Sequence, residues 1–206
     1  MDIAVEIGRK KVFAWAVDWP GWCRSARDQD GAVQALDMYW ERYAAAVALG
    51  GITVPTLRTV RITETLPGTA TTDFGAPDAV TEHDQAPLGG AALKRQLACL
   101  SAAWASLDQT VSEAPPSLRK GPRGGGRDRD AVLDHVLEAE RAYARKVGVT
   151  AKAGDPVDAR RDALLAGLAL AARPTSAPTA WPVRYALRRI TWHVLDHVWE
   201  IEDRTD

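Results

Sequence analysis

The stretch Trp192-His193-Val194-Leu195-Asp196-His197 places two imidazole side chains four residues apart, in a segment whose apolar spacing predicts a helix. Four residues advance an α-helix by about one turn and leave about 40° between the two side chains, so both rings can reach one ion. A third histidine lies in Asp134-His135-Val136-Leu137-Glu138-Ala139-Glu140, at the edge of a second predicted apolar helix face. The sequence therefore predicts that His135, His193 and His197 bind one divalent metal ion, with positions left open for water or substrate.

The three histidines also admit an ordinary structural explanation, in which they are polar positions of amphipathic helices that meet polar partners. A single His-x-x-x-His pair would favour that explanation. Three of the chain's four histidines lie on two predicted core-facing helices, however, and this favours the metal. The fourth, His83, lies in a polar Thr-Glu-His-Asp stretch and is left out of the predicted site.

Four helices are predicted around these histidines, because apolar residues recur at steps of three and four. The first helix starts near Ala91 and stops before Pro115-Pro116, since proline cannot continue a helix. The other three are predicted over about residues 128–147, 158–173 and 182–202. Four helices with mostly short connections are typical of a four-helix bundle.

The first 65 residues show a different period, with alternating apolar residues that predict strands. The predicted elements are strands over residues 3–7 and 12–17, a helix over 31–49 and a strand over 56–65. Residues 66–90 are rich in Pro, Gly, Thr, Ala and Asp, which predicts a linker or a long surface loop. The predicted fold class is α+β: a β-β-α-β domain over residues 1–65, a linker, and a helical domain over 91–206.

Charge and composition exclude several classes of partner. The formal net charge is −1, from 26 basic and 27 acidic residues, which argues against binding nucleic acid or a membrane surface through the whole-molecule field. No apolar run approaches the roughly 18 residues that a membrane-spanning helix needs. The N-terminal residues lack the apolar core of a secretory signal, so we expect a cytoplasmic protein in which Cys23 and Cys99 are reduced.

The two histidine motifs, in their order along the predicted helices, resemble those of the DinB/YfiT-like superfamily over about residues 91–206. The resemblance implies a four-helix bundle with His135, His193 and His197 as metal ligands. Zinc or nickel is expected first, and three imidazoles with open positions also suit iron or manganese. The superfamily includes mycothiol- and bacillithiol-dependent enzymes, so the implied activity is transfer of a low-molecular-weight thiol to a small-molecule electrophile. It also implies a homodimer.

The N-terminal residues carry a second resemblance. Asp18-Trp19-Pro20-Gly21-Trp22, followed by Arg24-Ser25 and an alanine-rich helix, resembles the HicB-like fold over about the first 50 residues. Domains of this kind often pair with a partner protein and act in regulation. The chain has no basic recognition helix after this part, which weakens a DNA-binding interpretation.

Several polar residues near the histidine motifs are candidates for a chemical role. Glu138 lies three residues after His135, nearly one helical turn further along, so it can act as a general base or orient a ligand. Glu200 lies three residues after His197 and can do the same. Arg189 precedes His193 by four residues and can bind a substrate carboxylate or phosphate. Each of the three side chains also fits a solvent-facing or paired role.

A basic, glycine-rich stretch over residues 119–127 leads into the helix of His135 and contains Arg119, Lys120, Arg123 and Arg127. Free N–H groups at such a helix start can bind anions, but the stretch lacks the phosphate-loop pattern. We therefore expect a solvated loop. The functions left open are a metal-dependent thiol S-transferase, a metal hydrolase with water as the nucleophile, and a non-catalytic small-molecule-binding or regulatory protein.

Overall fold

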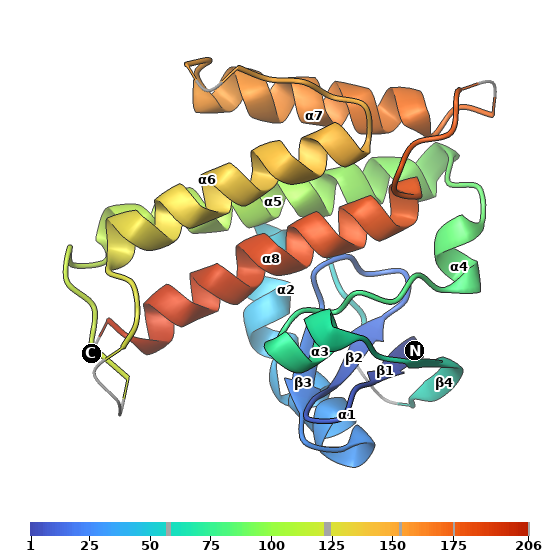
Figure 1. Ribbon diagram of the computed structural model, residues 1–206, viewed down its shortest axis with the longest axis horizontal. Coiled ribbons are helices and arrows are strands. Elements are labelled where there is room, and N and C mark those ends of the chain that lie inside the picture. Colours follow the sequence, from blue (N-terminus) through green and yellow to red (C-terminus); the bar gives the residue numbers. More distant parts are fainter. Residues whose placement is uncertain (57–58, 122–124, 153, 175, 206) are drawn as a thin grey trace.

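The computed structural model describes residues 1–56, 59–121, 125–152, 154–174 and 176–205. It is a mixed α+β structure in which a four-stranded sheet near the N-terminus is followed by helices (Figure 1). Part of the predicted strand over 56–65, namely residues 57–58, and the predicted loop residue Arg123 lie outside the described residues.

The sheet has the order β3-β2-β1-β4. Its strands are β1 (Asp2–Ile7), β2 (Val12–Ala16), β3 (Cys23–Ala26) and β4 (Arg61–Pro67). The first three strands pair antiparallel, and β4 pairs parallel to β1, so the chain crosses over before its last strand. The β-β-α-β prediction is corrected here, because it omits β3. This strand has only four residues and none of the alternation that marks a strand in a sequence.

The helix predicted over residues 31–49 is divided into α1 (Gln29–Met38) and α2 (Trp40–Ala48). Tyr39 separates them with a φ of −92° and a ψ of 5°, outside helical geometry. Asp28 begins α1, since its carboxylate accepts a hydrogen bond from the N–H of Gly31 at 2.8 Å. The apolar spacing continues across Tyr39, which is why the sequence predicts one helix.

The segment predicted as a linker carries two short helices, α3 (Ala70–Phe74) and α4 (Glu82–Gln85). A buried carboxylate holds it on one side: Glu6 of β1 accepts hydrogen bonds from the N–H groups of Asp78 and Ala79, both at 2.9 Å. On the other side, Arg188 donates to Asp84 at 2.7 Å and to the carbonyl of Ala79 at 2.9 Å. Residues 78–84 of this segment are therefore anchored on both sides, while many other residues of 66–90 are exposed.

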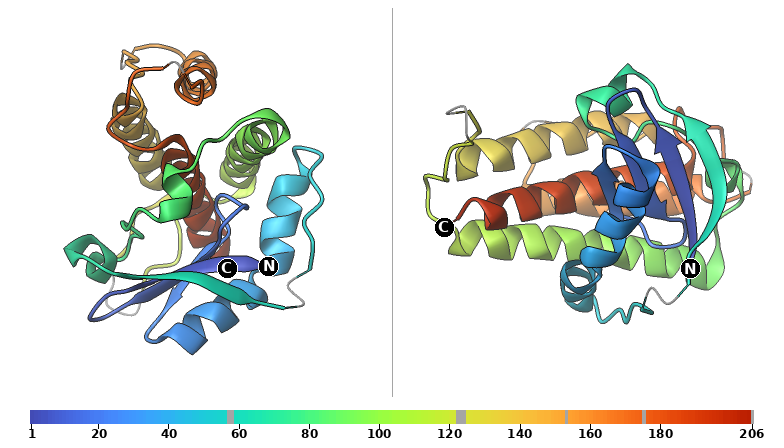
Figure 2. Two further views of the ribbon diagram at one scale, coloured as in Figure 1. Left: turned by 90° about the vertical axis from the view of Figure 1, so that its right-hand side faces the viewer. Right: turned by 90° about the horizontal axis from the view of Figure 1, so that it is seen from below.

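Four long helices follow, each within about two residues of its predicted bounds. They are α5 (Gly90–Glu113), α6 (Arg129–Lys146), α7 (Val157–Ala171) and α8 (Val183–Asp203). Figure 2 shows α8 between α5 and α6, with the sheet below it and α7 on the side away from the sheet. Among the described residues, no helix is both long and apolar enough to cross a membrane.

The sheet packs directly on α8. Phe13 of β2 meets Trp192 edge to face, with ring centroids 6.0 Å apart, and the Arg188 guanidinium lies 4.2 Å from the ring centroid of Trp15. Gly21, at a φ of +92°, lies so close to α8 that an added Cβ would be 2.7 Å from Cγ2 of Thr191. These contacts fix the rotation of α8 about its axis, and they leave the adjacent stripe of residues free to face α6.

Candidate metal centre

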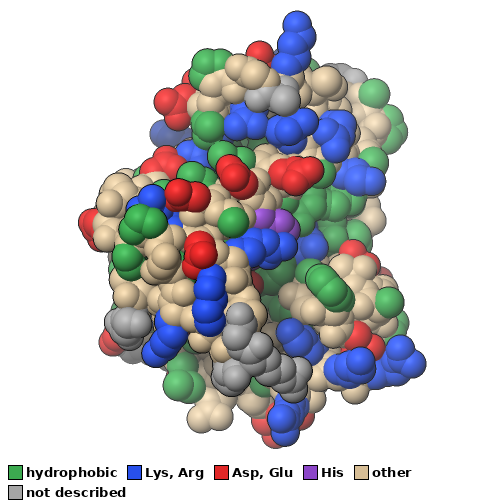
Figure 3. Space-filling model, turned by 60° about the vertical axis from the view of Figure 1, so that its left-hand side comes forward, with side chains coloured by type: hydrophobic (Ala, Val, Ile, Leu, Met, Phe, Trp, Pro, Cys, Tyr) green, Lys and Arg blue, Asp and Glu red, His purple; other side chains and the backbone are tan. Residues whose placement is uncertain are grey.

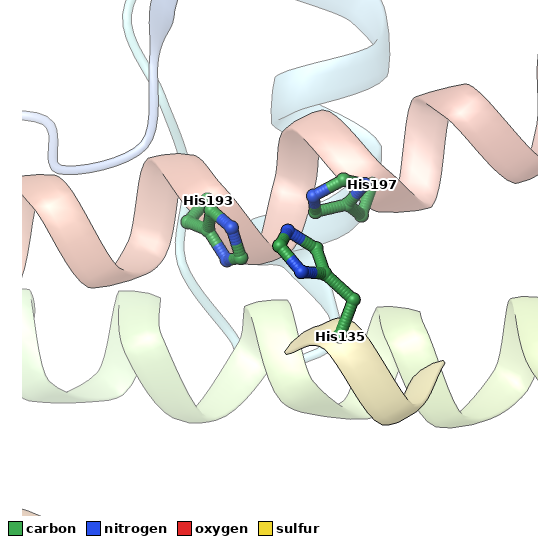
Figure 4. A group of neighbouring side chains, drawn as sticks. All are labelled: His135, His193 and His197. Atoms are coloured by element: carbon green, nitrogen blue, oxygen red, sulfur yellow. The ribbon is translucent and has the colours of Figure 1, made fainter. Parts of the chain in front are cut away.

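The three predicted histidines come together between α6 and α8 (Figure 4). One potential ligand nitrogen from each of His135, His193 and His197 lies within 4.8 Å of the other two. The ring centroids are 4.7 to 5.1 Å apart. Two Zn–N bonds of about 2.0–2.1 Å span at most about 4.2 Å, so the rings need only small rotations to hold one ion.

Packing on the two helices explains this convergence. Val132 and Val136 of α6 are fully buried, and His135, which is partly exposed, lies at the edge of the apolar face that they form. On α8, Trp192 and Arg188 face the sheet. Because His193 comes one residue after Trp192, about 100° further around the helix, it faces α6 instead. The core contacts of the two helices therefore place the histidines.

His193 is the most buried of the three, with 7% of its surface exposed, and its Nδ1 atom has no hydrogen-bond partner among the described residues. Burial, followed by the neighbouring His197 and His135, lowers the pKa of His193 to about 2. Burial also lowers the pKa of His135. An unpartnered buried nitrogen costs about 1–3 kcal/mol, and a metal bond would remove that cost. Neutral imidazole is a common ligand of divalent ions, and the lowered pKa values of His193 and His135 favour that form.

Glu200 orients the third histidine. Its Oε2 lies 2.7 Å from Nδ1 of His197, and this hydrogen bond is the main cause of the lowered pKa of Glu200. A carboxylate can only accept, so Nδ1 carries a proton in this hydrogen bond and Nε2 is the nitrogen left for an ion. The Arg204 guanidinium holds the other oxygen of Glu200 at 2.7 Å. Metal-binding histidines commonly have such a carboxylate partner.

The glycine-rich loop before α6 supports this arrangement from outside. Arg204 donates to the carbonyl of Arg119 at 2.8 Å and to the carbonyl of Arg127 at 2.7 Å. Gly126 has a φ of +122°, and an added Cβ would lie 2.6 Å from Nη2 of Arg204. Lys120 pairs with Asp128 at the start of α6. The described part of the loop therefore holds Arg204, and through it Glu200, in place.

The two predicted catalytic residues differ in their placement. Glu138 is exposed, and its side chain makes no hydrogen bond to any described residue, so it lies at the rim of the site. Arg189 is 7% exposed, and its guanidinium lies 4.7 Å from the Trp192 ring centroid and 5.7 Å from that of Tyr143. Sequence reasoning included Glu200 on its spacing but missed Tyr143 and Arg204, whose roles depend on contacts between distant segments.

The histidines are accessible from outside. Figure 3 shows histidine surface in a hollow of the molecule, directly beside Lys or Arg side chains. His135 and His197 are partly exposed, whereas His193 forms the buried end of the cluster. A small molecule can thus approach the open side of the three rings.

Together, the fold and this site define an α+β protein with a three-histidine cluster between two helices of its helical part. No protein-family model matches the chain, and neither the curated proteins nor the solved structures give a match. The resemblances to DinB-like and HicB-like proteins therefore stay predictions, and the functional proposal depends on the geometry of the site.

Proposed function

We propose that the chain is a divalent-metal-dependent enzyme of the DinB-like type, with His135, His193 and His197 as the metal ligands. The observation that carries the proposal is the convergence of three imidazoles, one with an unpartnered buried nitrogen. In this proposal α5 to α8 are the DinB-like four-helix bundle, and the N-terminal sheet with α1 and α2 is the HicB-like part. A three-imidazole set leaves coordination positions open, as catalytic sites do.

The reaction proposed first is transfer of a low-molecular-weight thiol, of the mycothiol type, to a small-molecule electrophile. A divalent ion held by three imidazoles lowers the pKa of a bound thiol or water towards neutrality. In the transfer, a sulfur–carbon bond forms, the leaving group departs with the electrons of its own bond to carbon, and the thiol proton passes to a base. Glu138 at the rim is the candidate base, and Arg189 is the candidate group for orienting the electrophile.

Metal content tests the first part of this proposal. We would purify the protein without an affinity tag or added metal, and compare it with His135→Ala and with His83→Ala as the matched control. His83 lies outside the cluster and contacts Arg184. We expect about one equivalent of metal in the natural protein and in His83→Ala, and little in His135→Ala. If all three proteins are empty and metal cannot be added back, the proposal is wrong and a non-catalytic role takes its place.

Turnover tests the second part. The metal-loaded protein would be assayed with low-molecular-weight thiols against a panel of electrophiles, and with esters and amides in the absence of thiol. Loss of thiol transfer in a folded His135→Ala variant would support the proposed reaction. Hydrolysis without thiol would identify water as the nucleophile, and full thiol-transfer activity in the metal-free variant would contradict the metal-dependent thiol transfer.

A further inference from the structure

Arg189 is a buried cation without a carboxylate partner among the described residues. Among the described residues, two other arginines are buried to a similar degree, Arg161 and Arg188, and each of them forms an ion pair. Arg161 lies 2.8 Å from Asp108, and Arg188 lies 2.7 Å from Asp84. Nη1 of Arg189 is shielded from solvent and has no hydrogen-bond partner in the described chain. Burying an unpaired charge is costly, so a fixed guanidinium of this kind favours an anion beside it.

Arg189 belongs to the same surroundings as the histidine cluster. It precedes His193 by one turn on α8, and its charge contributes to the lowered pKa of that histidine. Both side chains share two aromatic neighbours: the ring centroid of His193 lies 5.6 Å from that of Tyr143 and 6.2 Å from that of Trp192. The guanidinium lies over the same two rings. Arg189 is therefore held beside the buried end of the cluster.

The aromatic rings fix the guanidinium without using its hydrogen-bonding edge. Its central carbon lies within cation–π distance of the Trp192 and Tyr143 rings, a contact that uses no N–H donor, and Nη1 has no partner in the described chain. A guanidinium edge matches the paired oxygens of a carboxylate or a phosphate. The ring centroid of Trp181 lies 5.1 Å from that of Tyr143, so a third aromatic ring adjoins these two. A ligand with an anionic group next to an apolar group would contact both the guanidinium and these aromatic rings.

We infer that Arg189 is a binding residue for an oxyanion group, a carboxylate or a phosphate, carried by the small molecule on which the site acts. This inference rests on the proposed function in one respect: the reactive part of that molecule lies at the histidines. The anion contact itself belongs to Arg189, Trp192 and Tyr143, and it exists without a metal.

The test is a calorimetric titration of metal-free full-length protein with two probes, benzoate and inorganic phosphate. The variants are Arg189→Gln, Arg189→Lys and the control Arg145→Gln, which removes the same charge from an exposed position on α6. We expect saturable binding of at least one probe to the natural protein and to Arg145→Gln. Binding should be at least about tenfold weaker to Arg189→Gln, because a charge-assisted contact is lost. The affinity of Arg189→Lys should lie between those of the natural protein and Arg189→Gln, because lysine keeps the positive charge but lacks the planar guanidinium that binds two oxygens at once.

Each outcome decides the inference. Binding of benzoate alone identifies a carboxylate, and binding of phosphate alone identifies a phosphate group. Absence of binding by both probes, or equal binding to a folded Arg189→Gln variant, overturns the inference. Should Arg189→Gln fail to fold, the comparison of Arg189→Lys with the natural protein decides in the same way.

The metal content of Arg189→Gln, measured in parallel, separates this inference from the proposed function. If the protein binds metal but the natural protein binds neither anion probe, the metal proposal stands and the anion inference is wrong. If the natural protein binds an anion probe but holds no metal, the anion inference stands and the metal proposal is wrong.

Discussion

Glu200 acts on the candidate metal centre through His197, which it holds by a hydrogen bond at 2.7 Å. Removing the carboxylate frees the imidazole ring to rotate and leaves Nδ1 without its acceptor. Glu200→Ala should therefore lower metal affinity by roughly 10- to 100-fold, as loss of such partners typically does. Competition with a chromophoric chelator measures this affinity.

Glu138→Ala is the matched control for that experiment, because this glutamate is exposed and bonds to no described residue. Its metal affinity should equal that of the natural protein. An equal loss in both variants would mean that negative charge near the site matters, and that the hydrogen bond to His197 does not.

At the scale of single residues, the sequence predicted the three histidines but not all of the residues that hold them in place. His193 and His197 share a helix, so their spacing alone places them side by side. The support for Glu200 comes from Arg204, whose other partners are carbonyl groups of residues 119 and 127. Neither periodicity nor motif spacing contains that contact, because it depends on how the loop returns to the end of α8.

Helices α5, α6 and α7 are joined by a buried polar network around Glu140. Trp104 of α5 donates to Glu140 of α6 at 2.7 Å, and Arg161 of α7 lies 3.8 Å from the same carboxylate. Arg161 also pairs with Asp108 of α5 at 2.8 Å. Burial raises the pKa of Glu140, and the charge of Arg161 and the Trp104 bond only partly oppose this effect.

This raised pKa has a consequence for stability. The folded protein binds the Glu140 proton more tightly than the unfolded chain does, so the resulting stabilisation is present below the unfolded-state pKa of about 4.3. It is lost as the pH rises through the folded-state pKa. Glu140→Gln stays neutral and keeps an acceptor for Trp104, so its free energy of unfolding should rise relative to that of the natural protein over this range.

Urea unfolding of both proteins between about pH 4 and pH 7 measures that difference. Glu138→Gln, an exposed substitution on the same helix, should follow the pH dependence of the natural protein. A constant difference between Glu140→Gln and the natural protein across the range would show that Glu140 does not titrate there.

At the scale of elements, the long helices were predictable because their apolar stripes repeat over several turns. The short elements were not. α3 and α4 have five and four residues, too few for a period, and their starts depend on threonine caps at Thr69 and Thr81. Position within the fold, more than local preference, makes these elements form: Glu6 and Arg188 bind the backbone between them.

At the scale of the whole molecule, the continuous apolar core decides how the protein unfolds. One cluster of buried residues joins Ile3 and Val5 of β1 with Leu36 of α1, Leu107 of α5 and Leu195 of α8. Neither half can lose this core without exposing the apolar surface of the other. Residues 1–65 and 91–206 should therefore unfold together, in one cooperative transition.

Urea unfolding followed by tryptophan fluorescence and by far-ultraviolet circular dichroism tests this expectation. Tryptophans occur in both halves, while the dichroism signal comes mostly from the long helices. The two transitions should coincide in midpoint and slope. Two separated transitions would instead show independent domains on either side of residues 66–90.

The burial of α8 also affects how fast its sequence can change in evolution. Residues Tyr185–Leu195 are buried without interruption, because the sheet, α4, α5 and α6 together cover that part of the helix on all sides. A substitution there must satisfy several neighbours at once, whereas α7, at the periphery, meets few such demands. As relatives of this chain diverge, α8 should accumulate replacements most slowly, and its sequence is the one with which to seek distant members of the lineage.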